Sequence, residues 1–139
     1  MQSLEWTTDD YVYVSQMDSD HQKVFEDAEN LRRAITLGKP ASQMGFCLWR
    51  LAKSLSTHLA GEERLMRNSR YPAFQWHERQ HDAGRKKIAL LTQAIHRDDE
   101  LGVQETFQDL ARWLRDHVHL ADHMLAAHLR NDQRERLAS

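Results

Sequence analysis

Apolar residues recur every three or four positions in four segments of this chain, and this spacing is the strongest constraint on its fold. An α-helix turns once in about 3.6 residues, so the spacing places an apolar stripe along one helical face. The segments cover about residues 19–37, 42–68, 72–96 and 102–130. Long helices with short connections favour an all-α, up-down-up-down four-helix bundle.

Local signals give the expected helix boundaries. Residues 1–17 show no helical periodicity and are expected to form an irregular N-terminal arm. Residues 18–20 (Asp-Ser-Asp) offer capping oxygens to the first helix, and Ser42 offers one to the second. Pro72 suits the first turn of the third helix. The arm and the helices together predict a single domain over residues 1–139.

Composition argues against several classes of protein. The formal charge is -2 and no basic tract is present, which disfavours nucleic acid as a partner. The sequence contains no run of 18 apolar residues, which is about the length needed to cross a membrane. The N-terminus lacks the features of a signal peptide, so a cytoplasmic location is expected. Cys47 is the one cysteine, which rules out an internal disulfide and a thiolate metal site; we expect it to be buried.

Ionisable side chains interrupt all four predicted stripes. They are His21 on the first helix, His58 and Glu62 on the second, His77 and His81 on the third, and His117 with Asp122 on the fourth. The fourth stripe is expected to continue through Ala121 to Met124. Because neighbouring helices of such a bundle are antiparallel, these groups are predicted to meet at one end of it.

A single histidine on an apolar stripe is more often an ordinary core residue than a metal ligand. Five histidines and two carboxylates at one depth are hard to explain as ordinary core residues, because burying an unpaired charge costs on the order of several kcal/mol. A bound cation removes that cost. The pattern therefore predicts a metal site in the bundle interior.

The number of donors indicates more than one metal ion. Seven ligands exceed what one tetrahedral zinc site uses, whereas two metal ions bridged by the carboxylates would use them all. His58/Glu62 and His77/His81 have the i, i+4 spacing that puts two ligands on one helix face. Nitrogen and oxygen donors without sulfur suit Fe, Mn, Zn or Ni.

The spacing of His117 and Asp122 is less favourable. Five residues separate them, which leaves the two side chains roughly 140° apart on an ideal α-helix. Either Asp122 reaches in from the edge of the stripe, or one wide π-helical turn re-aims it.

The remaining histidines provide a comparison. His96 lies in a polar connection, and His119 and His123 share a face with charged residues and are expected to face solvent. His119, Asp122 and His123 form a rival cluster that no second helix supports. His128 is expected to be an end group or an outer support of the metal site.

Four motifs resemble the hemerythrin family in its bacterial single-domain form: MDSDH, HLAGEERLM, YPAFQWHERQH and WLRDHVHLAD. The resemblance runs from Trp6 to about His128. It implies a non-haem centre of two Fe ions joined by an oxo or hydroxo bridge. One iron would be held by His77, His81 and His117, the other by His21 and His58, with Glu62 and Asp122 bridging the two.

The resemblance also implies a function. The iron with two histidines keeps an open position where O2 would bind reversibly, for transport, storage or delivery, without catalysis. Reversibility requires a dry pocket, and its expected walls are Val24, Trp113, Leu114 and Val118. A sensor of O2, NO or redox state acting with a separate partner, and a di-iron oxidase or peroxidase, are the alternatives. No protein partner is indicated.

Two positions depart from the family pattern. Leu59 stands where Phe is frequent, and Asp20 stands where Gln is frequent. Both neighbour predicted ligands without replacing one, so they leave the oxygen affinity open.

Overall fold

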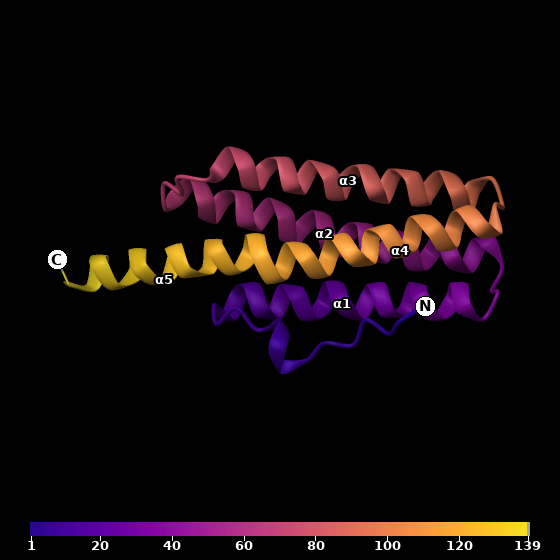
Figure 1. Ribbon diagram of the computed structural model, residues 1–139, viewed down its shortest axis with the longest axis horizontal. Helices are drawn as coiled ribbons and strands as arrows, with labels where there is room; N and C mark the ends of the chain where they lie inside the picture. The colour runs from indigo at the N-terminus through magenta and orange to yellow at the C-terminus, as the bar shows by residue number, and fades with distance from the viewer. Residues whose placement is uncertain (139) are drawn as a thin grey trace.

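The computed structural model describes residues 1–138, which form helices and connecting segments without a strand. The helices are η1 (Thr8–Asp10), α1 (Ser15–Thr36), α2 (Ala41–Asn68), α3 (Phe74–His96), α4 (Glu100–Asp116), η2 (His117–Asp122) and α5 (His123–Ala138). Figure 1 shows that α4, η2 and α5 continue one another as a single rod, which packs beside α1, α2 and α3. The prediction of an all-α four-helix bundle is confirmed.

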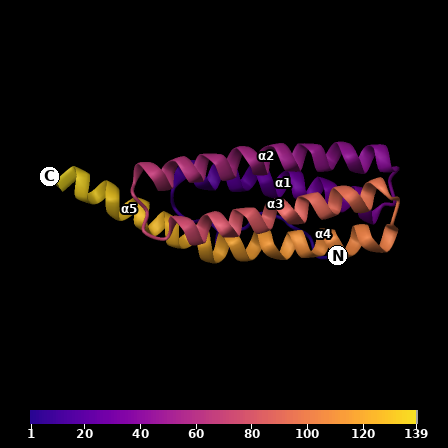
Figure 2. The same ribbon diagram turned by 90° about the horizontal axis from the view of Figure 1, so that it is seen from above.

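The two views agree on the topology. α1 and α3 run in one direction, and α2 and the α4–α5 rod run in the other (Figures 1 and 2). α5 extends beyond the other helices at the end where α2 ends and α3 begins. The arm crosses the outside of the bundle along α1. In the described part of the chain, no helix is both long and apolar enough to cross a membrane.

Several helix starts differ from those expected. α1 begins at Ser15, before the predicted cap, and the Asp18 carboxylate instead accepts hydrogen bonds from the backbone N–H groups of Val12 (2.8 Å) and Tyr13 (3.0 Å). That carboxylate therefore fastens the end of the arm to α1. Ser42 lies within α2, where Pro40 is the N-cap without a side-chain hydrogen bond.

The third and fourth helices also begin elsewhere. Pro72 lies in the turn before α3, which begins two residues later. α4 begins at Glu100, because the Asp99 side chain accepts a hydrogen bond from the Gly102 N–H at 3.0 Å. The helix therefore begins at its capping carboxylate, about two residues before the start predicted from the apolar stripe.

The apolar stripes form the core, as their spacing predicts. Large fully buried side chains come from all four long helical segments and include Phe25 of α1, Leu51 of α2, Leu91 of α3 and Phe107 of α4. Cys47 is only partly buried, contrary to expectation.

The apolar stripe of the fourth segment shifts by one residue after Asp122. Met124 was expected to face the core but is 46% exposed, whereas Leu125 is 0% exposed. The cause is η2, whose π-helical turn holds one residue more than an α-helical turn and shifts every later side chain by one position.

Gly84 of α3 packs directly against Trp113 of α4. A Cβ atom added at Gly84 would lie 2.4 Å from the Trp113 Cη2 atom. The indole cannot easily retreat, because it is buried and stacks on His117 with ring planes 17° apart and centroids 4.8 Å apart.

We therefore expect Gly84→Ala to lower the free energy of unfolding by about 1–3 kcal/mol in denaturant titrations. Gly45→Ala in α2 is the matched control, since a Cβ there meets no atom within 4 Å. That substitution should raise stability by about 0.5–1 kcal/mol. Equal effects of the two changes would contradict this packing.

Candidate metal centre

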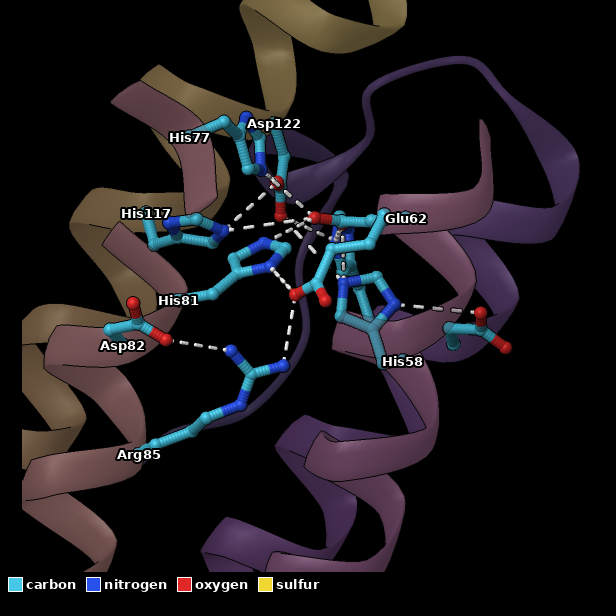
Figure 3. Close-up of polar contacts among 11 residues, drawn as sticks. His58, Glu62, His77, His81, Asp82, Arg85, His117 and Asp122 are labelled. Atoms are coloured by element: carbon cyan, nitrogen blue, oxygen red, sulfur yellow. Dashed lines mark hydrogen bonds and ion pairs between the residues drawn. The ribbon is translucent and has the colours of Figure 1, made fainter. Parts of the chain in front are cut away.

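The structure brings all seven predicted donors into one buried cluster (Figure 3). Its members are His21 of α1, His58 and Glu62 of α2, His77 and His81 of α3, and His117 and Asp122 of η2. None is more than 5% exposed, and His77, His81 and Asp122 are fully buried. Bulk water therefore cannot solvate the polar atoms at the centre.

The cluster divides into two groups that share both carboxylates. The five-donor group contains Glu62, Asp122, His77, His81 and His117. The four-donor group contains Glu62, Asp122, His21 and His58. Within each group the donor atoms lie within 4.8 Å of one another, so either group could surround one metal ion.

Each carboxylate offers one oxygen to each group. Glu62 Oε1 lies 3.0 Å from the Nε2 atoms of His77 and His81, and Glu62 Oε2 lies 2.6 Å from His58 Nε2. Asp122 Oδ1 lies 3.1 Å from the Nε2 atoms of His77 and His117, and Asp122 Oδ2 lies 2.8 Å from His21 Nε2. This division would allow each carboxylate to bridge two cations, one in each group.

Attraction between the histidines and the two carboxylates controls the protonation of the metal-free cluster. Burial alone would raise the pKa of the Glu62 carboxyl, but nearby histidines, led by His58, hold that pKa well below its usual range. Burial and the Glu62 charge act likewise on Asp122, whose pKa is also held well below its usual range by His117 and His21. Burial lowers the pKa of His117, yet the two carboxylates outweigh burial and raise it to about 9. Protons thus supply the positive charge that the buried carboxylates require.

Protons do not satisfy every atom of the cluster. The Nε2 atoms of His58 and His117, Glu62 Oε2 and Asp122 Oδ1 are buried. They lie within ion-pair distance of one another, but none of them makes a hydrogen bond of acceptable geometry with the described residues. Buried polar atoms without a hydrogen bond are rare in proteins and call for a specific explanation. Imidazole nitrogens and carboxylate oxygens directed at common points fit cations at those points.

Asp122 reaches the cluster because of η2. Hydrogen bonds in a π-helix join residues five apart, so His117 and Asp122 come to face the same side. Of the two explanations that the spacing left open, the wide turn is the one observed. The rival cluster does not form among the described residues. His119 is exposed, as expected, and its Nε2 atom lies 2.6 Å from Asp10 Oδ1 of the arm.

The predicted pocket residues are buried but do not all lie on the same side. Trp113 stacks on His117, which places it against the five-donor group instead of the four-donor group where the open position was expected. Val24, Leu114 and Val118 are at most 4% exposed. Trp6 of the arm, which the sequence did not single out, has its ring centroid 6.1 Å from that of His21.

Two further contacts involve histidines and could not be predicted from helical periodicity. The Glu63 carboxylate accepts a hydrogen bond from His81 Nδ1 at 2.7 Å, although Glu63 lies off the apolar stripe of its helix. His128 Nε2 donates to the backbone carbonyl of Ser69 at 2.9 Å, and its ring packs beside Tyr71. His128 therefore acts as an end group that fastens α5 to the end of α2.

Comparison with known proteins agrees with the motifs. Residues 12–129 match the family model described as the hemerythrin HHE cation binding domain. The chain is 27% identical over 139 residues to a protein of Stenotrophomonas maltophilia (strain R551-3) named Bacteriohemerythrin, covering 97% of this chain and 90% of that relative. The family match spans most of the chain and includes every residue of the cluster, so this chain belongs to the hemerythrin family.

Proposed function

We propose that the cluster holds two iron ions and that the protein binds O2 reversibly. His77, His81 and His117 would hold one iron, and His21 and His58 the other. Glu62 and Asp122 would bridge them, together with an oxo or hydroxo group. The observation that carries the proposal is the division of both carboxylates between the two groups. Membership of the hemerythrin family and the similarity to a bacteriohemerythrin support iron as the metal and O2 as its ligand.

The unequal donor sets suggest where O2 binds. The five-donor group contains three histidines, and the four-donor group contains two. Because the carboxylates are shared, a metal ion held by the four-donor group would have one protein ligand fewer, which would leave a position for a small molecule. The chemistry that a bound iron pair supplies is reversible donation of electrons to dioxygen.

Burial is the contribution of the surrounding residues to reversibility. Val24 follows His21 by three residues on α1 and is 1% exposed, and Val118 follows His117 directly and is also 1% exposed. Apolar side chains at these positions exclude water and protons, which would otherwise promote oxidation of the iron. Leu114, 4% exposed, lies one turn before Val118 and extends this apolar surface.

The donor composition favours a carrier over an enzyme. Di-iron carboxylate proteins of the ferritin-like class use four carboxylates and two histidines. Here five histidines and two carboxylates form the cluster. Sensing of O2, NO or redox state through a separate partner remains the second candidate, because it would use the same binding chemistry.

The proposal predicts two iron ions per chain after anaerobic loading. His77→Ala should lose most of this iron, because His77 Nε2 faces both carboxylates, at 3.0 and 3.1 Å. His96→Ala should retain it, since His96 is an exposed histidine at the far end of α3. Metal analysis after gel filtration gives the answer, and full iron content in His77→Ala would refute the assignment.

Exposure of the reduced, iron-loaded protein to air should produce a new absorption spectrum that disappears under vacuum and returns with O2. Several such cycles should leave the spectrum unchanged. Rapid, permanent oxidation with release of peroxide, or turnover of an added reductant, would indicate an oxidase or peroxidase instead.

Iron binding should release protons at pH 7. The pKa of His117 is about 9 in the metal-free protein, above its ordinary value of 6.5, so the ring is protonated at pH 7 and the metal ion must displace that proton. Affinity should therefore increase as the pH rises from 7 towards 9, and acid below about pH 5 should strip the iron. Anaerobic calorimetry in buffers with different ionisation enthalpies measures this release, and a buffer-independent heat would contradict it.

A further inference from the structure

His81 is supported from outside the cluster by a chain of charged residues. Its Nδ1 atom lies 2.7 Å from Glu63 Oε2, and the same oxygen accepts a hydrogen bond from Arg85 Nη2 at 2.9 Å. Arg85 Nη1 in turn donates to Asp82 Oδ1 at 3.0 Å. Figure 3 shows this chain leading from the labelled Asp82 and Arg85 to the His81 ring.

No other histidine of the cluster has comparable support among the described residues. His58 Nδ1 lies 3.4 Å from Asp20 Oδ2, at the outer limit of a hydrogen bond. The Nδ1 atoms of His21, His77 and His117 are buried and make no hydrogen bond. The short contact of His81 is therefore specific to one ring, and that ring belongs to the five-donor group alone.

The contact determines how His81 meets a metal ion. A carboxylate can only accept hydrogen bonds, so Nδ1 of His81 is the donor. A neutral ring with its proton on Nδ1 presents its lone pair at Nε2, the atom that lies 3.0 Å from Glu62 Oε1 and faces the centre. The bond also fixes the plane of the ring. A negative acceptor at Nδ1 makes Nε2 a stronger electron donor.

On the basis of the proposed di-iron site, we propose that Glu63 is a positioning residue that orients His81 and strengthens its donation to the iron of the five-donor group. Glu63 is nearly buried, with its side chain 13% exposed, which preserves the effect of its charge. Arg85 holds Glu63 in place and offsets part of that charge. The consequence is an iron pair in which the five-donor side binds its metal more firmly and favours the ferric state.

The test uses the full-length, iron-loaded protein and separates positioning from charge. Glu63→Ala removes the acceptor, and iron should be lost at a chelator concentration about 10- to 100-fold lower than for the wild type. Glu63→Gln keeps an acceptor but removes the charge, so the midpoint potential of the iron should become more positive. Circular dichroism of each variant verifies that the bundle has formed.

Asp82→Asn and Asp82→Ala are the matched controls, because they change a carboxylate that contacts Arg85 but not His81. Their effects on chelator resistance and potential should be clearly smaller. Arg85→Gln leaves Glu63 its charge and removes the offsetting cation, so the midpoint potential should move in the negative direction. A purely structural role of the chain would not give opposite signs for Glu63→Gln and Arg85→Gln.

The outcomes distinguish this inference from the function on which it rests. Two irons in the wild type, with Glu63 variants that match the Asp82 variants in chelator resistance and potential, would overturn the role of Glu63 alone. A wild-type chain that holds no iron would overturn the proposed function and this inference together. Early iron loss in Glu63→Ala and opposite potential shifts would establish the role.

Discussion

Two carboxylates buried side by side are the constraint on which the rest of this structure depends. Glu62 and Asp122 are at most 1% exposed, and their like charges raise one another's energy. Such a pair is stable only beside compensating positive charge. In the metal-free protein that charge comes from protonated histidines, because the carboxylates raise the pKa values of His21, His58, His77 and His117. The histidines can act as ligands when cations replace those protons. The fold of the bundle can therefore be understood as a support for this pair.

The backbone departs from regular geometry where the pair requires it. An ordinary α-helix would carry His117 to the centre and leave Asp122 at its side. η2 inserts the extra residue that brings both inward, and the same insertion exposes Met124 and buries Leu125. A requirement of the site thus changes which side chains of α5 face the core. Placement of such turns at functional sites is a recurrent feature of helical proteins.

Periodicity was enough to predict the bundle and the convergence of the five histidines and Glu62, because both depend on which residues share a helical face. Asp122 lies off that face on an ideal helix. Periodicity could not choose between the two ways of bringing Asp122 inward, since that choice depends on packing against α1 and α3. The contact between Asp10 and His119 and the position of Trp6 were missed for a different reason. An irregular arm has no period, so its contacts follow from tertiary structure alone. Glu63 was missed because it lies off the stripe and reaches His81 on a neighbouring helix.

X-ray absorption spectroscopy of the iron-loaded protein tests the central claim most directly, because it measures the distance between metal ions. If Glu62 and Asp122 each give one oxygen to each of two irons, the spectrum should contain scattering from a second iron at about 3.5–4 Å, or somewhat closer if an oxo bridge is present. Iron surrounded by nitrogen and oxygen ligands but without an iron neighbour would contradict the paired centre.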